Sequence, residues 1–299
     1  IIYDIASVKK VNTISPTWFS IASNDGTLDS LALADYVNTA HSNNMEVWPL
    51  IDNFSENIDF AAVMNSTSAR NKIENQLIAA AIEYSFDGIN VDFENISEAA
   101  ADGFIQFVRE LSVMCRKNGI VLSVDVPVPM DFTAHYNRKA LGEVCDYMMI
   151  MGYDEHYSGS EEAGSVARLT FEEEGIQNTL QEVAAEKIIS GIPFYTRLWC
   201  TMTNEDGTAT VTSEAMGMNE AQQTLENNQA ESSWDETTGQ NYAQFEGTDG
   251  ALYQIWLEDT ASLTKKLELI KKYDLGGVAE WKLGLEDDSV WDLIAKYIS

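Results

Sequence analysis

The sequence predicts a (β/α)8 barrel with one small inserted α+β subdomain, and three observations support this fold class. Seven short runs rich in β-branched residues are spread over the 299 residues, amphipathic stretches lie between them, and one long polar segment interrupts the alternation. Regular alternation of strands and helices indicates a parallel sheet with crossover connections. An open, doubly wound sheet is the alternative that fits the same pattern.

The expected strands are identified by their length, their β-branched content and the Gly or Asn residues that flank them. They cover residues 11–19, 45–51, 88–94, 120–128, 147–154, 187–195 and 276–284. Apolar residues at i, i+3 and i+4 predict helices at 68–85 and 97–119. One strand of an eight-stranded barrel is therefore unaccounted for. The first ten residues are too few for a strand and a crossover helix, so we expect them to end the first helix and the first strand to lie upstream of residue 1.

The polar segment 201–254 is expected to form the inserted subdomain within a single catalytic barrel that spans residues 1–299. It is rich in Asn, Gln, Thr, Glu and Gly, and it ends in the hairpin-like stretch YAQFEGTDGALYQIWLED. The helical pattern returns only after it. A chain of this length can bury the core of one large α/β domain.

Composition and charge limit the possible functions. No apolar run approaches the roughly 18 residues of a membrane span, so we expect a soluble protein. The net charge of −30 disfavours nucleic acid and anionic membranes as partners, and a neutral substrate or a cationic wall component fits better. Cys115, Cys145 and Cys200 are widely spaced with no ligand pattern around them, so we expect neither a disulfide framework nor a metal site. We expect no cofactor.

The stretch FDGINVDFEN, residues 86–95, alternates apolar and polar side chains. In a strand, Asn90, Asp92 and Glu94 share one face, with about 7 Å between successive members. In a barrel that face points inward, and Glu94 lies at the carboxyl-terminal rim where active sites form. A solvated strand edge that ends in an acidic loop is the alternative. Because acidic groups inside a parallel strand are costly unless a site uses them, we interpret these residues as a candidate catalytic group.

DGINVDFE resembles the D-x-x-D-x-D-x-E signature of glycoside hydrolase family 18, the chitinase and endo-N-acetylglucosaminidase family, with Asn90 where the second Asp usually stands. Three further motifs occur in the expected order: MGYDEH at 151–156, GIPFYTR at 191–197 and GVAEW at 277–281. The resemblance covers most of the chain, including the insertion, and is strongest to a bacterial branch of spore-cortex and cell-wall N-acetylglucosaminidases. It places the signature on the fourth strand, although only two strands are visible before it.

The resemblance implies a retaining, substrate-assisted reaction, in which the 2-acetamido oxygen of the sugar attacks C1 and forms an oxazolinium intermediate. Glu94 would be the general acid and then the base, with its pKa raised by burial and a neighbouring carboxylate. Asp92 would accept the acetamido N–H and balance the developing positive charge. Asn90 would support Asp92 by donating a hydrogen bond to it.

The resemblance also implies the residues that contact sugar. Tyr153 would reach the acetamido oxygen as a third catalytic residue, with Asp154 in support. The expected substrate-binding residues are Trp281, which would stack on the pyranose ring, Met151 in the same subsite, Tyr195 and Arg197 at the border of the cleft, and Trp18, for which core packing is the alternative.

The expected partner is a polysaccharide or oligosaccharide that contains N-acetylglucosamine, either peptidoglycan or a chitin-like glycan. We expect a monomeric protein and, by resemblance, a location outside the cell or in association with the cell wall or spore. A non-catalytic, chitinase-like sugar-binding protein is the alternative from another functional class. The joint presence of Glu94, Asp92 and Tyr153 favours the enzyme.

Overall fold

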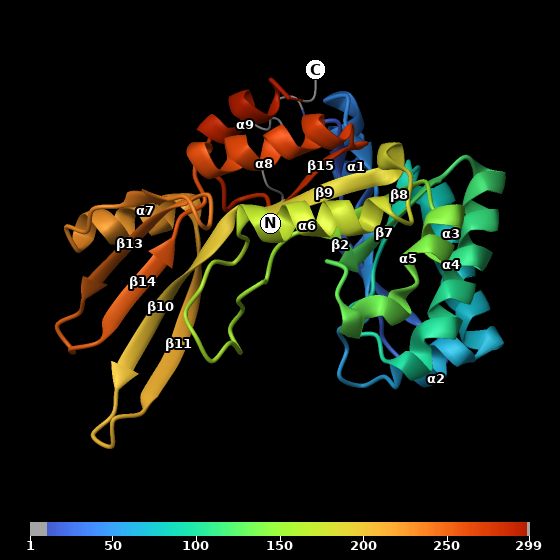
Figure 1. The fold of residues 1–299 in the computed structure, drawn as a ribbon. Coiled ribbons are helices and arrows are strands. Elements are labelled where there is room, and N and C mark those ends of the chain that lie inside the picture. The colour runs from blue at the N-terminus through green and yellow to red at the C-terminus, as the bar shows by residue number, and fades with distance from the viewer. Residues whose placement is uncertain (1–10, 298–299) are drawn as a thin grey trace. The chain divides into compact units, whose positions relative to one another are not determined.

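The computed structural model describes residues 11–297 of the chain. Its contacts divide the chain into two compact units, which we describe one at a time (Figure 1). Unit 1 contains the chain up to Ile150 together with Thr179–Ile188, and unit 2 contains Met151–Asn178 and the chain from Ile189 onward. The expectation that residues 1–10 end a helix falls outside the described residues.

Unit 1 is built on neighbouring strands in the order β8-β7-β6-β5-β2-β3. The pairs β2–β5, β5–β6 and β6–β7 are parallel, whereas β3 is an antiparallel partner of β2. A separate short parallel pair is formed by β1 and β4. The bounds are β1 (Thr13–Ile14), β2 (Thr17–Ile21), β3 (Leu28–Ser30), β4 (Glu46–Val47), β5 (Leu50–Asp52), β6 (Gly88–Asp92), β7 (Val121–Pro127) and β8 (Tyr147–Met151).

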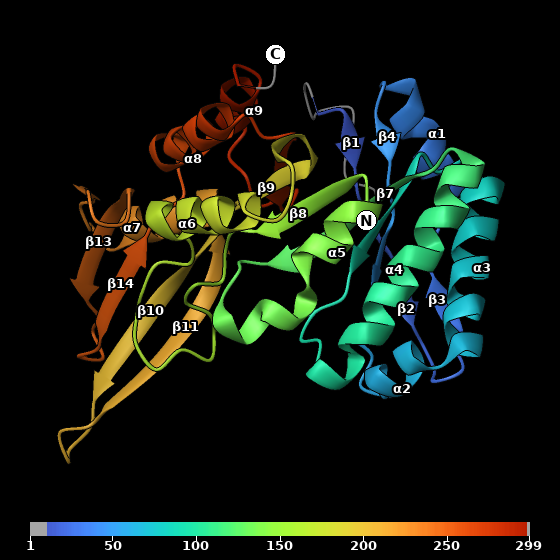
Figure 2. The same ribbon diagram turned by 45° about the vertical axis from the view of Figure 1, so that its right-hand side comes forward.

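The helices of unit 1 lie along these strands, with α3 (Thr67–Tyr84) and α4 (Glu98–Asn118) side by side in Figure 2. Ser66 caps α3 by accepting a hydrogen bond from the Ala69 N–H. Gly119, with φ 67°, ends α4 in the left-handed conformation that glycine adopts most readily. The shorter helices are α1 (Ala34–Ser42), α2 (Phe60–Asn65), α5 (Arg138–Val144) and the 3₁₀ helices η2 (Asp131–Tyr136) and η3 (Ala185–Lys187).

The two faces of β6 have different environments. Phe93, which follows the strand, packs its ring against Phe104 and Phe107 of α4, with ring centroids 5.9 and 5.5 Å away. Because side chains alternate along a strand, this apolar contact fixes which face turns toward the helices. Asn90 and Asp92 are buried on the opposite face.

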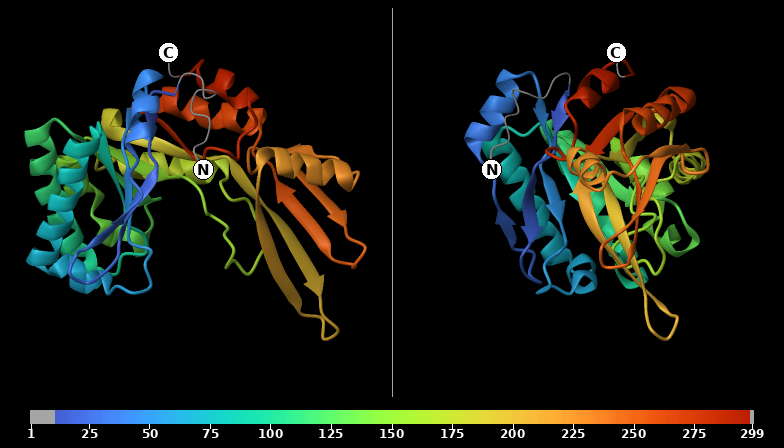
Figure 3. Two further views of the ribbon diagram at one scale, coloured as in Figure 1. Left: turned by 180° about the vertical axis from the view of Figure 1, so that it is seen from behind. Right: turned by 90° about the vertical axis from the view of Figure 1, so that its left-hand side faces the viewer.

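Unit 2 contains the parallel pair β9 (Ile188–Pro193) and β15 (Gly277–Trp281). The antiparallel sheet of the insertion has the order β11-β10-β14-β13-β12. In Figure 3 the long β10–β11 hairpin extends beyond the other strands of that sheet. The bounds are β10 (Tyr195–Thr203), β11 (Ala209–Gly217), β12 (Ser233–Asp235), β13 (Gln240–Glu246) and β14 (Leu252–Trp256), with helices α6 (Leu169–Leu180), α7 (Met218–Asn227), α8 (Thr260–Tyr273) and α9 (Ser289–Ile294).

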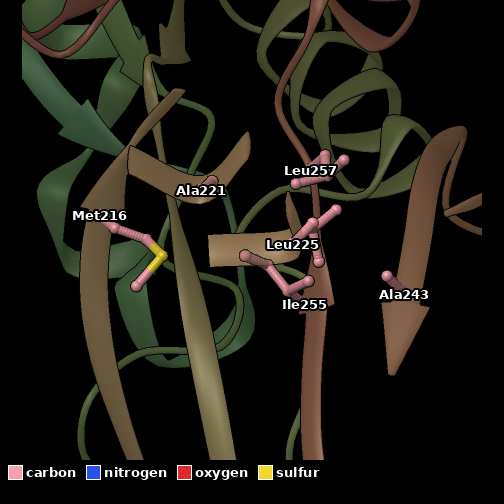
Figure 4. Close-up of a cluster of buried hydrophobic side chains, with 6 residues drawn as sticks. All are labelled: Met216, Ala221, Leu225, Ala243, Ile255 and Leu257. Atoms are coloured by element: carbon pink, nitrogen blue, oxygen red, sulfur yellow. The ribbon is translucent and has the colours of Figure 1, made fainter. Parts of the chain in front are cut away.

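A small apolar core holds α7 against the insertion sheet (Figure 4). Ala221 and Leu225 of α7 meet side chains from three strands and from the chain that follows β14; these partners are Met216, Ala243, Ile255 and Leu257. The sheet therefore has its own core, as an inserted subdomain requires. Its elements run from Tyr195 to Trp256, a few residues wider than the expected segment. The division of the chain into one barrel with one insertion stays a prediction.

A buried ion cluster lies elsewhere in unit 2. The Lys266 ammonium group of α8 is 2.6 Å from a carboxylate oxygen of Glu258 and 3.8 Å from one of Glu172 in α6. Ser262 donates to Glu258 at 2.8 Å, and Ser190 of β9 donates to Glu172 at 3.1 Å. These polar contacts join α6, α8 and β9 inside the unit.

The seven expected strands are all present, although those at 11–19 and 45–51 are each divided into two short strands and the other five end one to three residues early. The expected strand at 147–154 ends at Met151, and the one at 276–284 ends at Trp281. The expected strand at 88–94 ends at Asp92, so Glu94 lies just beyond it. Both expected helices are confirmed as α3 and α4.

Candidate active site

The candidate catalytic group of unit 1 is organised around a row of aspartates on neighbouring parallel strands. Asp52 at the end of β5 is the register partner of Asp92 at the end of β6. On the other side of β6, Val91 is the partner of Val124, and the next residues are Asp92 and Asp125. All three aspartates are buried, with exposed fractions of 7%, 6% and 2% along the row.

Asn90 is held between two side chains of β7. The Ser123 hydroxyl donates to Asn90 Oδ1 at 2.5 Å, and Asn90 Nδ2 donates to Asp125 Oδ2 at 2.8 Å. The sequence pattern suggested that Asn90 donates to Asp92. In the structure its amide donates to Asp125 instead, because the parallel register places Ser123 and Asp125 beside it.

Burial and like charges raise the pKa values of two carboxyl groups in the row. Burial is the larger cause for Asp92, and the charges of Glu94 and Asp52 add to it, so that the pKa of Asp92 rises to about 7. The pKa of Asp125 is held well above its ordinary range, first by burial and then by the charge of Asp92. One oxygen of each carboxyl group, Asp92 Oδ1 and Asp125 Oδ1, has no hydrogen-bond partner.

The backbone around Glu94 is fixed by Asn53, which follows β5. The Glu94 N–H donates to Asn53 Oδ1, and Asn53 Nδ2 donates to the Glu94 carbonyl oxygen, both at 2.9 Å. Glu94 itself is partly exposed and its charge acts on Asp92. A half-buried carboxyl group beside a buried one is a suitable arrangement for moving a proton to and from a bound substrate.

In unit 2, Tyr153, Asp154 and Tyr195 form a second group of predicted site residues. The Tyr195 hydroxyl donates to Asp154 Oδ1 at 2.5 Å. The rings of Tyr153 and Tyr195 meet edge to face, with centroids 6.2 Å apart. Burial and the Asp154 charge raise the pKa of the Tyr195 hydroxyl well above its ordinary value, so this hydroxyl remains a donor.

The other predicted residues of unit 2 are not all part of this group. Arg197 of β10 donates to Ser213 of β11 at 3.1 Å and so lies on the insertion sheet. Met151 ends β8 and is half-buried. Trp281 ends β15 with an exposed fraction of 38%, which is high for a tryptophan.

Trp18 is the predicted site residue that packing explains best. Its exposed fraction is 8%, and its ring meets Tyr36 and Phe86 at centroid distances of 5.2 and 5.8 Å. We therefore do not include Trp18 in the proposed site. Among residues 11–297, no group of three or more His, Cys, Asp or Glu side chains could hold a metal ion. In the same part of the chain, every helix is too short or too polar to cross a membrane.

The family model for glycosyl hydrolases family 18 matches residues 2–286. The chain belongs to this family. It is 27% identical over 298 residues to an uncharacterized glycosylase, YvbX, of Bacillus subtilis, covering 96% of this chain and 84% of that protein. It is 25% identical over 285 residues to the cortical fragment-lytic enzyme of Bacillus subtilis, covering 92% of this chain and 65% of that protein. The chain thus spans about two thirds of the cortical enzyme's length.

A solved structure confirms the fold class of this family 18 chain. The C-terminal domain of a putative chitinase from Desulfitobacterium hafniense superposes with a TM-score of 0.90, at 21% identity, covering 99% of this chain and 94% of that domain. The family 18 neighbours are TIM barrels, so the predicted (β/α)8 fold is confirmed and the doubly wound alternative is wrong. The expectation of a first strand upstream of residue 1 stays a prediction.

Sequence reasoning missed three polar residues around the candidate catalytic group of this family 18 chain. Asp52, Ser123 and Asp125 come from strands on either side of β6. A signal for Asp125 was present, because LSVDVPV places Ser and Asp two residues apart among valines in a strand. An acidic residue at a buried strand position indicates a polar interior face.

Proposed function

We propose that this family 18 chain is a retaining glycoside hydrolase that cleaves β-linked N-acetylglucosamine glycans by substrate-assisted catalysis. The observation that carries the proposal is the Asp92–Glu94 pair. Asp92 is 6% exposed, has an unpartnered oxygen, and has a pKa raised to about 7 partly by the Glu94 charge. A carboxyl group whose pKa is raised in this way can exchange a proton near neutral pH.

In the first half of the proposed reaction, protonated Glu94 gives its proton to the glycosidic oxygen. The acetamido oxygen of the same sugar attacks C1 as the C1–O bond breaks, and the leaving sugar departs as an alcohol. The oxazolinium that forms carries a positive charge and an N–H. Ionised Asp92 accepts that N–H, and its negative charge stabilises the oxazolinium.

In the second half, water attacks C1 of the oxazolinium and passes a proton to Glu94, which acts as a base. The C1–O bond of the oxazoline ring breaks, and the acetamido group is restored. Because C1 is attacked twice from opposite faces, a β-linked substrate gives a β-anomeric product. Glu94 ends the cycle protonated, as it began.

For unit 2 we propose sugar-contacting roles that rest on the local arrangement of each residue. Tyr153 donates its hydroxyl to the acetamido oxygen, and Asp154, held by Tyr195, supports that subsite. Trp281 stacks on a pyranose ring, which its 38% exposure favours. Met151 and Arg197 contribute to the walls around the sugar.

We propose peptidoglycan or a chitin-like glycan as the substrate, and a location outside the cell in association with the wall or spore. The relative described as a cortical fragment-lytic enzyme supports this substrate class. The net charge of −30 supports the choice of a neutral or cationic glycan over nucleic acid. We propose that the chain acts as a monomer.

The substrate is tested by digesting purified peptidoglycan, chitin oligomers and a high-mannose glycoprotein side by side and identifying the new reducing ends. We expect new N-acetylglucosamine reducing ends from peptidoglycan or chitin. Proton NMR of the earliest product should show the β-anomer. An initial α-anomer would exclude the substrate-assisted route.

The role of Glu94 is tested by Glu94→Gln, with Glu98→Gln as the matched control. A carboxamide keeps the shape of the side chain but cannot donate the required proton, so Glu94→Gln should abolish hydrolysis while the fold and sugar binding are retained. Glu98 is an exposed residue in the first turn of α4, and its substitution should leave activity unchanged. Full activity of Glu94→Gln on a substrate that the wild type cleaves would refute the mechanism.

A further inference from the structure

The row of aspartates on β5, β6 and β7 contains more carboxyl groups than the proposed mechanism uses. Asp52, Asp92 and Asp125 occupy neighbouring positions on adjacent parallel strands, and such strands lie about 4.8 Å apart. Three ionised carboxylates at that spacing in a buried site would repel strongly. At least one of them must therefore hold a proton near neutral pH.

The three members of the row differ in their hydrogen bonds. Asp52 Oδ1 accepts from the Ser20 hydroxyl at 2.5 Å and from the Phe54 N–H at 3.2 Å. Asp125 Oδ2 accepts from Asn90, which leaves Oδ1 of the same carboxyl group unpartnered. Asp92 Oδ1 is unpartnered too. Among the three, the neighbours Asp92 and Asp125 are the ones with a fully buried oxygen that lacks a hydrogen-bond partner.

Asn90 determines which oxygen of Asp125 is spare. Its Oδ1 accepts from Ser123, so its amide nitrogen must face Asp125. That amide can donate a hydrogen bond but cannot accept the shared proton. The proton of the row is therefore directed to the free oxygens of Asp92 and Asp125 and away from position 90.

We propose that Asp125 is a positioning residue for hydrolysis, which holds the proton that Asp92 must release before Asp92 can accept the substrate acetamido N–H. The O–H bond on Asp92 breaks as an O–H bond on Asp125 forms, so the pair keeps one proton and one negative charge throughout. The transfer reverses when the product leaves. This inference rests on the proposed function, and it assigns to β7 the carboxyl group that the family pattern has at position 90.

The charges around Asp125 agree with this role. The titratable groups that face the pair are Asp52 from β5, Glu94 after β6 and Tyr136 of η2. All of these are acidic groups, so each negative charge among them favours retention of the shared proton. Burial raises the pKa of the Tyr136 hydroxyl to about 12, so that hydroxyl stays neutral over the working range.

The first test compares Asp125→Asn with the wild type on the chitin tetramer and on purified peptidoglycan. We expect kcat to fall about tenfold to a hundredfold, below the roughly 10²–10⁴ of a direct acid or base, with KM nearly unchanged because Asp125 is buried beneath the site. The alkaline limb of the pH profile should move down by about one pH unit, since the shared proton loses one of its two positions. Ser123→Ala is the control, because it loosens the same network without removing a carboxyl group, and its alkaline limb should stay in place.

The second test is the exchange variant Asn90→Asp/Asp125→Asn. The new amide at 125 can donate to the new carboxyl at 90, and Ser123 can still donate to position 90, so the hydrogen bonds are retained with one reversed. We expect the double variant to recover most of the kcat lost in Asp125→Asn and to restore the alkaline limb. A merely structural Asp125 would give reduced kcat at every pH, an unmoved limb and no recovery, and that result would overturn the inference.

A third measurement needs no activity and so separates this inference from the proposed function. The titration of the Asp125 carboxyl carbon, followed by ¹³C NMR in the free protein, should move to lower pH in Asp92→Asn. An unchanged midpoint would show that the two groups do not share a proton, even if the enzyme is active. An inactive wild-type protein with a coupled midpoint would instead refute the proposed function alone.

Discussion

Replacing Asp92 with Asn should change how the stability of the protein depends on pH. The pKa of Asp92 is about 7 in the folded protein against an ordinary value of 3.8. The folded state therefore keeps a proton that the unfolded chain releases, and the resulting stability is fully present below about pH 4 and lost as the pH rises through 7. Asparagine does not titrate, so the variant lacks this part of the slope.

The size of this stability difference follows from the one proton that the folded state holds on Asp92. Each pH unit over which the folded state alone holds that proton changes the free energy of unfolding by about 1.4 kcal/mol. Between pH 5 and pH 7, allowing for partial ionisation near 7, the wild type should lose about 2 kcal/mol more than Asp92→Asn. The 6% exposure of Asp92 leaves little solvent to reduce that difference.

The assay is urea unfolding at pH 5, 6 and 7, followed by fluorescence and by circular dichroism so that coincident transitions can be verified. Asp102→Asn, at an exposed position of α4, is the matched control and should follow the wild-type pH dependence. Parallel pH dependences for Asp92→Asn and the wild type would refute the claim that the folded state stores a proton on Asp92.

Two further predictions concern other buried charges. Asn90 Nδ2 lies 2.8 Å from Asp125, so Asn90→Asp places a second carboxyl group beside that carboxyl group. The added negative charge raises the pKa of the neighbouring acid, and the alkaline limb of kcat/KM against pH should move upward. Superimposable profiles would mean that position 90 is not coupled to the proposed catalytic pair. Lys266→Met leaves Glu258 and Glu172 without their buried cation and should destabilise the protein by about 3–5 kcal/mol at pH 7. Because burial raises the pKa of Glu172 to about 7, the loss should shrink at pH 5, whereas the exposed control Lys265→Met should cost little at either pH.

The polarity of β6 could be predicted from the sequence because it depends on strand alternation alone. Asn90 and Asp92 share a buried face, and Phe93 packs on the other side, as the alternating pattern indicates. The order of the four sequence motifs was equally informative, because it indicated glycoside hydrolase family 18 without any knowledge of tertiary contacts. Local periodicity and short motifs were sufficient for both conclusions.

The partners of these residues could not be predicted, because they depend on the register between strands that are distant in the sequence. Asp125 reaches Asn90 only because Ser123 pairs with Asn90 across β6 and β7. Lys266 was missed for a similar reason. Its surroundings, TKKLELIKK, are typical of an exposed helix face. Its ammonium group is nevertheless buried and pairs with the carboxylates of Glu258 and Glu172.

Trp18 shows where the sequence leaves two alternatives open. A tryptophan near the end of an early strand is a reasonable candidate for stacking on sugar, but the sequence does not reveal which rings surround it. Tyr36 from α1 and Phe86 from the turn before β6 enclose the indole. These ring contacts favour core packing for Trp18, and no local sequence pattern records such contacts.

The path of the chain through unit 1 limits how the protein can be divided. The chain leaves unit 1 after Ile150 and returns for Thr179–Ile188. In that returning segment the Lys187 ammonium donates to the carbonyl oxygens of Gly142 and Cys145 at 2.8 and 3.0 Å, and a side chain at Gly142 would collide with Val183. A gene fragment that stops at residue 150 would encode every member of the aspartate row but would omit this closing segment. Expression trials that seek a minimal folded piece of unit 1 should therefore retain the chain at least through Ile188, and nicking in the largely exposed loop at 157–162 should be better tolerated than truncation at 150.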